Sequence, residues 1–193
     1  MDPTTGSRLV HYGAHEILEA TPIACTRAET MASILHIAVG LAAGRLHAGR
    51  PRPLHALAFA ALSMLPDADI IMFKLGYAYR HPLGHRGASH SLAFALACGL
   101  ATLLLTRGAW KTAGLVALVV LSHPLLDAMT DGGLGVGLLW PLSDTRFFAP
   151  WRPIPVAPMG WNFLSASGLR VALAELLPSL PLVLYALWPS TRR

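Results

Sequence analysis

Five long apolar stretches separated by short polar segments are the feature that most constrains the fold of this chain. They cover residues 32–44, 54–73, 91–106, 113–129 and 169–188. Leu, Ala and Val dominate them without strict alternation, which is typical of helices, and several approach the roughly 20 residues that cross a bilayer. The sequence therefore predicts an all-α polytopic membrane bundle of four to five helices. The shorter stretches leave open tilted, re-entrant or buried helices in a compact bundle.

The composition supports lipid as the solvent for part of the surface. Of 193 residues, 54% are hydrophobic and only 13% are charged, against an ordinary charged share of about 25%. One soluble core of this size has no room for that much apolar side chain. These values exclude a disordered chain, a coiled coil and a disulfide scaffold, and they disfavour a free cytosolic protein.

The chain divides into a polar tail and one apolar domain. Residues 1–31 carry mixed charge and lack the basic start and apolar stretch of a secretory signal. Residues 32–190 are expected to form a single membrane-embedded helical domain, interrupted at about 130–168 by an irregular segment rich in Gly, Pro and Trp.

Basic residues are spread between the apolar stretches rather than clustered in one motif. The net charge is +5, but single Lys and Arg residues in loops are typical of a membrane surface. We expect the lipid bilayer as a partner and no nucleic acid. The bias of positive charge favours a cytoplasmic location for the side that carries Arg45, Arg50, Arg52, Arg107, Lys111, Arg192 and Arg193.

Ionisable groups in or beside the apolar stretches are the informative residues, because each is costly there without a partner. They are His36, Asp67, Asp69, His85, His90, His123 and Asp127. If successive stretches alternate in direction, the start of the first and third stretches and the end of the second and fourth lie on the same side. All seven side chains are then expected to converge at one face of the bundle.

Their chemistry points to a divalent metal. His123 and Asp127 are four residues apart, so on a helix both can reach one cation. Imidazole nitrogen with carboxylate oxygen is the ligand set of catalytic zinc and of manganese or iron. This set of His and Asp residues predicts a site for one or two divalent ions, and zinc is the metal that it favours most. Alternatives remain open for individual residues: a hydrogen-bonded helix contact for His36, a turn for Asp67 and Asp69, and interfacial loop positions for His85 and His90.

Two arginines beside these groups are candidates for contact with an anionic substrate. Arg86 lies inside the His-rich loop, and Arg146 follows the fourth apolar stretch. An arginine fork next to a metal suits a phosphate or a carboxylate, although either arginine could instead be an interfacial anchor. With Asp67 and Asp69, one of which is expected to ligate and the other to act as a base or support, they form the candidate catalytic set.

The motifs that carry these residues resemble the YdjM-like (DUF457) family of membrane-bound metal-dependent hydrolases. The matching segments are Leu65–Asp69, His85–Ser91, Ser122–Asp127 and Leu139–Phe147. The resemblance implies an inner-membrane, multi-pass helical protein with a divalent metal site and hydrolase activity.

More distantly, the order of the His and Asp residues is similar to that of the zinc-dependent phospholipase C and P1 nuclease group. That resemblance implies metal ligation by His36, Asp67 or Asp69, His85 or His90, His123 and Asp127, with Asp127 able to bridge two ions. The group's further His and His-x-x-x-Glu set has no counterpart after Asp127, which points to one or two ions instead of three.

These observations favour a hydrolase in which a metal-activated water attacks a phosphoester, including that of a lipid. Two other classes use the same residues differently. A transporter for divalent cations or protons would use them as a transit site, and a non-enzymatic membrane protein would use the metal to hold its helices together.

Overall fold

The computed structural model describes residues 29–30, 34–155, 157–158 and 165–189. The predicted polar tail, residues 1–31, lies outside the described residues except for Glu29 and Thr30. These two residues form strand β1 (Glu29–Thr30), which pairs antiparallel with β2 (Ala157–Pro158).

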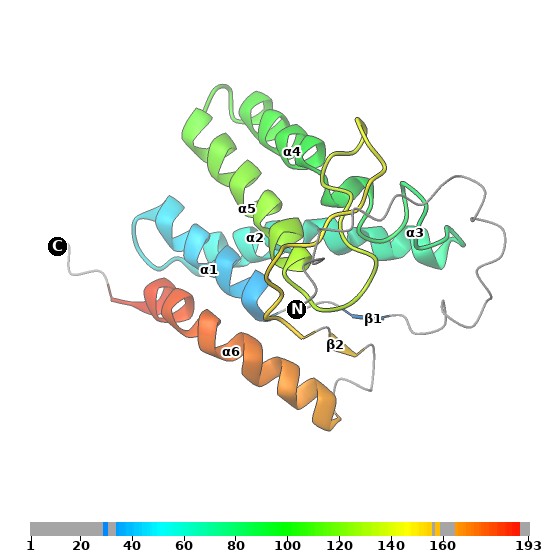
Figure 1. Cartoon of the computed structure of the whole chain (residues 1–193). Coiled ribbons are helices and arrows are strands. Elements are labelled where there is room, and N and C mark those ends of the chain that lie inside the picture. Colours follow the sequence, from blue (N-terminus) through cyan, green and yellow to red (C-terminus); the bar gives the residue numbers. More distant parts are fainter. Residues whose placement is uncertain (1–28, 31–33, 156, 159–164, 190–193) are drawn as a thin grey trace, which may run out of the picture.

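The rest of the described chain is helical with irregular connections (Figure 1). The helices are α1 (Ile34–Ala48), α2 (Pro53–Ser63), α3 (Ile70–Lys74), α4 (Leu92–Leu105), α5 (Trp110–Ala128) and α6 (Ala166–Leu187), with 3-10 helices η3 (Leu65–Asp69) and η4 (Ala88–His90). The predicted all-α class is confirmed. Helices α5 and α6 continue through their internal prolines, Pro124 in the first and Pro178 and Pro181 in the second.

Two described helices, α5 and residues 168–187 of α6, are long and apolar enough to cross a membrane. A third span is added if α2 and residues 65–72 are counted together, and α1 and α4 are apolar but shorter. The bundle therefore combines full-length spans with short helices, as the uneven lengths of the apolar stretches indicate.

The second apolar stretch does not form a single helix. Helix α2 ends at Ser63, η3 follows after Met64, and the axis bends by 52° between the two segments. Pro66 lies at the start of η3, where a residue without a backbone N–H is tolerated. The bend turns Asp67 and Asp69 into the protein interior, where both are buried.

Helices α1 and α2 form a closely packed hairpin. A Cβ atom added to Gly40 would lie 2.5 Å from the Cα of Ala60, and one added to Gly44 would lie 2.6 Å from the carbonyl oxygen of His55. Small residues four apart allow this close approach of membrane helices.

The remaining helices complete one bundle around this hairpin. Phe59, Ala95, Val116, Val119 and Val120 form the main apolar core between α2, α4 and α5. Helix α6 packs along α1, while Leu96, Leu100 and Leu104 of α4 remain exposed, as expected for a lipid-facing surface. The N-terminus of α1, the end of η3, the start of α4 and the C-terminus of α5 meet at one end of the bundle (Figure 1).

Candidate metal centre

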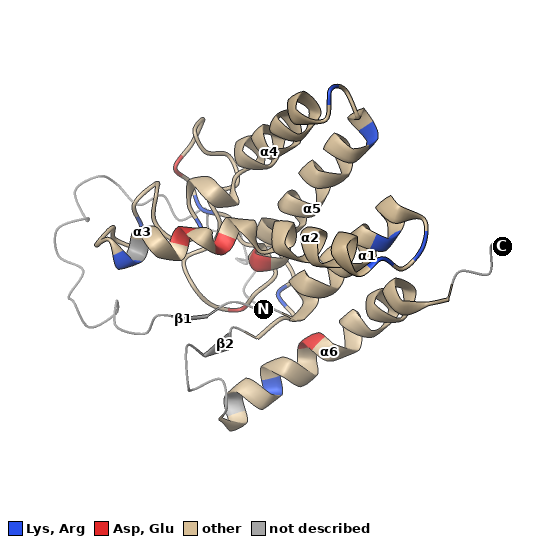
Figure 2. Cartoon of the chain, turned by 180° about the vertical axis from the view of Figure 1, so that it is seen from behind, with Lys and Arg blue, Asp and Glu red and all other residues tan. Residues whose placement is uncertain are grey.

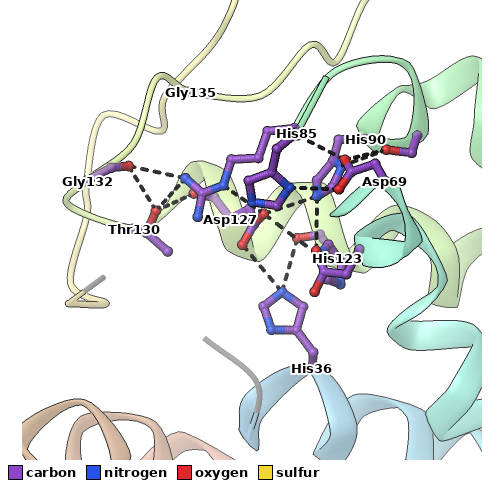
Figure 3. A network of polar contacts seen from close by, with 12 residues as sticks. His36, Asp69, His85, His90, His123, Asp127, Thr130, Gly132 and Gly135 are labelled. Atoms are coloured by element: carbon purple, nitrogen blue, oxygen red, sulfur yellow. Dashed lines mark hydrogen bonds and ion pairs between the residues drawn. The ribbon is translucent and has the colours of Figure 1, made fainter. Parts of the chain in front are cut away.

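All seven of the predicted His and Asp residues come together at this end of the bundle (Figure 3). Each is buried, and His36, His90, His123 and Asp127 are 0% exposed. Helix α1 supplies His36, η3 supplies the two neighbouring aspartates, the loop before η4 supplies His85, and η4 and α5 supply the rest. The convergence follows from the alternating direction of the helices.

Four of these residues form a compact group: Asp67, His90, His123 and Asp127. One ligand atom from each lies within 4.8 Å of all the others. The Nε2 atom of His123 is 2.9 Å from Oδ1 of Asp67, and Nε2 of His90 is 3.3 Å from Oδ2 of Asp127. This is the two-imidazole, two-carboxylate donor set that suits zinc or another first-row divalent ion.

Hydrogen bonds on the far side of each ring fix the tautomers of both histidines. Nδ1 of His123 lies 2.8 Å from the carbonyl oxygen of Ser63, which can only accept. Nδ1 of His90 lies 3.0 Å from the hydroxyl oxygen of Ser89, which accepts its proton because the hydroxyl itself donates to Oδ2 of Asp69; that carboxylate oxygen is also 3.1 Å from Nδ1 of His90 as an ion pair. Because each Nδ1 donates its proton, each neutral ring presents the lone pair of Nε2 to the centre of the group, as metal-binding histidines do.

Asp69 differs from Asp67 in that donors already satisfy its carboxylate. It accepts hydrogen bonds from Nδ1 of His85 at 2.7 Å, the backbone N–H of Arg86 at 3.0 Å and the hydroxyl of Ser89 at 2.8 Å, in addition to its contact with His90. Asp69, His85 and His90 also lie close enough to form a second candidate group. One imidazole offers one nitrogen lone pair, so His90 can serve only one of the two groups in its neutral form.

His36 lies at the edge of the compact group. Its Nε2 is 3.7 Å from Oδ1 of Asp127 and 3.3 Å from the carbonyl oxygen of His123. Its ring packs on that of His123 with centroids 4.1 Å apart. Because a carbonyl oxygen can only accept, the Nε2 of His36 carries a proton, and His36 is placed to support Asp127 rather than to share its ion.

Arg86 brings a guanidinium into this set of carboxylates, and it is 2% exposed. Its Nε lies 3.1 Å from Oδ2 of Asp127 in an ion pair that lacks hydrogen-bond geometry. Its Nη1 donates to the hydroxyl of Thr130 and to the carbonyl oxygen of Gly132. With a backbone φ of 60°, Arg86 holds a conformation that costs about 1–3 kcal/mol outside glycine, so the surrounding contacts must impose it.

Apart from the Nε of Arg86, which is a donor, the unpartnered atoms of the cluster are of the types that ligate a divalent cation. Among the described residues, buried side-chain atoms without a hydrogen-bond partner are His36 Nδ1, Asp67 Oδ2, Arg86 Nε, His90 Nε2 and both carboxylate oxygens of Asp127. Every one of them belongs to this site, and buried polar atoms of this kind are otherwise rare. Three buried carboxylates and one buried guanidinium leave two negative charges when the imidazoles are neutral, which one divalent ion balances.

The same negative charge acts on His90. Burial alone would lower its pKa, but contacts with the carboxylates of Asp127, Asp67 and Asp69 outweigh burial and raise the pKa to about 10. A proton or a metal ion on the Nε2 of His90 therefore serves the same electrostatic purpose.

Arg146 lies outside the cluster. Its Nη1 donates to the carbonyl oxygens of His85 and Gly135, and its Nη2 donates to that of Tyr79. Burial lowers the pKa of Arg146. These contacts hold the loop before η4 against the segment after α5, and the predicted contact of Arg146 with substrate stays a prediction.

Several residues that build the site were not singled out from the sequence. Ser63 and Thr130 act through contacts that nothing in the local pattern indicates. Glu175 is different, because it is the acidic residue inside the last apolar stretch and meets the same criterion as the other ionisable groups. It is 2% exposed and accepts the backbone N–H groups of Ile34 and Leu35 at 2.8 and 3.2 Å, at the start of α1.

Fold and site together define a helical membrane protein with a buried His/Asp cluster at one end. The family model of the YdjM inner membrane protein matches residues 31–191. The chain is 44% identical over 152 residues to the inner membrane protein YbcI of Escherichia coli (strain K12), an alignment that covers 75% of this chain and 87% of the relative. The chain belongs to the YdjM family and is a multi-pass inner membrane protein. No solved structure matches it.

Proposed function

We propose that Asp67, His90, His123 and Asp127 bind one divalent metal ion, zinc first, and that the protein is a membrane-bound metal-dependent hydrolase. The observation that carries the proposal is the concentration of unpartnered, fully buried ligand atoms in this group. The hydrogen bonds from Nδ1 of both histidines support it, because they direct two lone pairs at a common point.

If these four residues hold a zinc ion, the ion would supply Lewis acidity and would lower the pKa of a bound water to about 7. The chain contributes the remaining functions. Asp69 orients His85 through a hydrogen bond and His90 through an ion pair and the intervening hydroxyl of Ser89, and the oxygen of Asp67 that lacks a hydrogen-bond partner is placed to ligate or to accept a proton. Arg86, held against Asp127, supplies positive charge for an anionic group.

The substrate class that this arrangement fits best is a phosphoester, including that of a phospholipid. The site lies at the end of the bundle where α1, α4 and α5 meet irregular segments. Lipid-exposed irregular backbone is excluded from the hydrocarbon core, so this end lies at the boundary between lipid and water, where lipid phosphates are found.

The complete burial of the cluster favours a second candidate, a metal that holds the helices together without catalysis. His36, His90, His123 and Asp127 have no exposed surface, and they come from α1, η4 and α5. An ion shared by these elements would contribute its binding energy to folding. The predicted alternative of a cation or proton transporter has no specific observation in its favour.

Metal analysis of the full chain purified in detergent tests the first part of the proposal, which is the binding of a divalent ion. The expected result is about one zinc or other divalent ion per chain and its loss in the His123→Ala, Asp127→Ala double variant. A matched control is His55→Ala, a histidine outside the cluster that stacks on His47. The absence of metal from folded wild-type protein after reconstitution with zinc, manganese or iron would overturn the proposal.

Hydrolysis is tested separately with the metal-loaded protein. Phospholipid vesicles and soluble phosphomonoesters and phosphodiesters are compared for release of phosphate or alcohol, with Arg86→Gln as the catalytic variant. We expect turnover that requires the metal and falls in Arg86→Gln while metal content is retained. Stoichiometric metal without turnover, together with unfolding by chelators, would favour the structural role, and metal-dependent flux across vesicles would favour transport.

A further inference from the structure

Five cations gather at the end of the bundle opposite the metal centre. They lie at the end of α1, in the turn between α1 and α2, and around the turn between α4 and α5: Arg45, Arg50, Arg52, Arg107 and Lys111. Lys111 and Asp127 lie on the same helix, α5, and at 1.5 Å per residue they are about 24 Å apart along its axis. Figure 2 shows both turns as basic segments distant from the acidic segments of the site. We call this surface the basic end.

The two turns form one surface. The Nε2 of His47, on α1, lies 3.1 Å from the hydroxyl of Thr112, on α5, and the ring of His47 stacks on that of His55, on α2, with centroids 5.2 Å apart. Three helices from two hairpins are therefore in contact where the cations lie.

Among the described residues, the helices that carry these cations contribute no carboxylate to this end of the bundle. Residues 34–63 and 92–126 contain neither Asp nor Glu, and the same is true of residues 176–189. Arg50, Arg52, Arg107 and Lys111 are exposed. At the opposite end, by contrast, Asp67, Asp69 and Asp127 accompany the cations. A concentrated positive surface next to an apolar bundle attracts anions from outside the protein.

Aromatic residues place the basic end at the level of lipid headgroups. Trp110 and Trp188 are 70% and 64% exposed. The Nζ of Lys111 lies 5.5 Å from the ring of Trp110, and the guanidinium of Arg45 lies 5.1 Å from the ring of Tyr185. Exposed Trp and Tyr residues beside cations are typical of the membrane–water interface.

We propose that the basic end binds the phosphates of anionic phospholipids between the α1–α2 turn and the α4–α5 turn. Arginine side chains match phosphate oxygens in two-pronged hydrogen bonds, and the apolar surfaces of the helices below contact the acyl chains. This binding is independent of the metal centre and of any reaction there.

The test compares phosphatidylglycerol with phosphatidylcholine for binding to the full chain in neutral detergent, by native mass spectrometry. The wild type is expected to prefer phosphatidylglycerol, and Arg50→Gln, Arg52→Gln, Arg107→Gln combined to weaken that binding about a hundredfold, at about fivefold per cation. The matched control removes three exposed cations from the other end: Lys74→Gln, Arg152→Gln and Arg170→Gln. It is expected to retain the preference.

Three results would overturn the proposal. The first is equal affinity of the wild type for the two lipids. The second is an equal loss in both triple variants, which would reflect net charge rather than a surface. The third is competition by inorganic phosphate or glycerol phosphate at the affinity of the lipid itself, which would indicate a site for soluble anions.

Discussion

Asp67 and Asp69 are only two residues apart, but their carboxylates have different surroundings. Donors surround Asp69, whereas one oxygen of Asp67 has no hydrogen-bond partner. We expect Asp67→Asn to abolish metal binding, and Asp69→Asn to weaken it by about 10–100-fold, the usual cost of losing a group that orients ligands. Metal affinities from competition with a chelating dye measure the difference. An equal loss in the two variants would show that Asp69 is itself a ligand.

The raised pKa of His90 predicts a pH dependence of metal binding. Below its pKa of about 10, His90 carries a proton that must leave before Nε2 can donate its lone pair to a metal. Protons and metal therefore compete, and the apparent affinity should rise about tenfold per pH unit between about pH 6 and pH 7.5, where carboxylates stay ionised.

Calorimetry in buffers of different ionisation enthalpy measures this competition. We expect release of close to one proton per metal ion at neutral pH. An affinity that is constant with pH, or uptake of protons, would contradict the role given to His90.

For single residues, the sequence predicted that the seven His and Asp side chains come together, but it did not predict the role of each one. Alternating helix direction brings the seven His and Asp side chains to one end. The distinction between Asp67 and Asp69 depends on the positions of Ser89 and His85, which local spacing does not specify. The position of the Arg146 side chain likewise depends on its hydrogen bonds to three backbone carbonyl oxygens, which come from distant parts of the chain.

Among the elements, helix α1 depends on a carboxylate from another helix. Glu175 of α6 accepts two backbone N–H groups at the start of α1, where an anion also interacts favourably with the helix dipole. Glu175→Leu leaves these donors unsatisfied and should lower stability by about 2 kcal/mol, with a smaller loss for Glu175→Gln, which keeps an acceptor.

Thermal unfolding in one detergent measures the effect of Glu175. Ser179→Ala is the matched control, because the Ser179 hydroxyl is buried on the same helix but donates to the backbone of Glu175 within α6. It should change stability much less than Glu175→Leu. An equal loss in these two variants would refute the capping role.

The contact between α1 and α2 predicts a sharp difference between glycines. Gly40→Ala introduces a methyl group that would lie 2.5 Å from backbone atoms of α2, whereas Gly114 of α5 has no neighbour within 4 Å of an added Cβ. Gly40→Ala should separate the helices and cost about 1–3 kcal/mol. Gly114→Ala should be neutral or slightly stabilising, because Ala favours helix. The unfolding midpoints of the two variants measure this difference in stability. Equal midpoints would contradict the predicted difference between the two glycines.

The break in the second apolar stretch shows the limit of hydrophobicity as a guide to elements. Residues 54–73 form one apolar stretch interrupted only at residues 66–69, where the sequence left open a turn at Asp67 and Asp69. The bend after Ser63 depends on Pro66 and on the need of two aspartates for interior partners, a tertiary requirement that a local pattern does not contain.

For the whole molecule, the distribution of charge along the bundle axis implies an orientation in the membrane. The basic end carries cations without carboxylates, and positively charged short loops stay in the cytoplasm. We therefore predict that the candidate metal centre faces the opposite, periplasmic side. Both segments that cover it, residues 75–91 and 129–155, lack long helices and therefore lie outside the hydrocarbon core.

Single cysteines test this orientation in whole cells. In a background with Cys25→Ser and Cys98→Ala, we introduce Thr145→Cys at the site end or Pro51→Cys at the basic end, both exposed positions. A maleimide that does not cross the inner membrane should label Thr145→Cys in spheroplasts, and should label Pro51→Cys only after lysis. The reverse pattern would place the metal centre in the cytoplasm. It would also restrict the proposed hydrolase to substrates that the cytoplasmic leaflet presents.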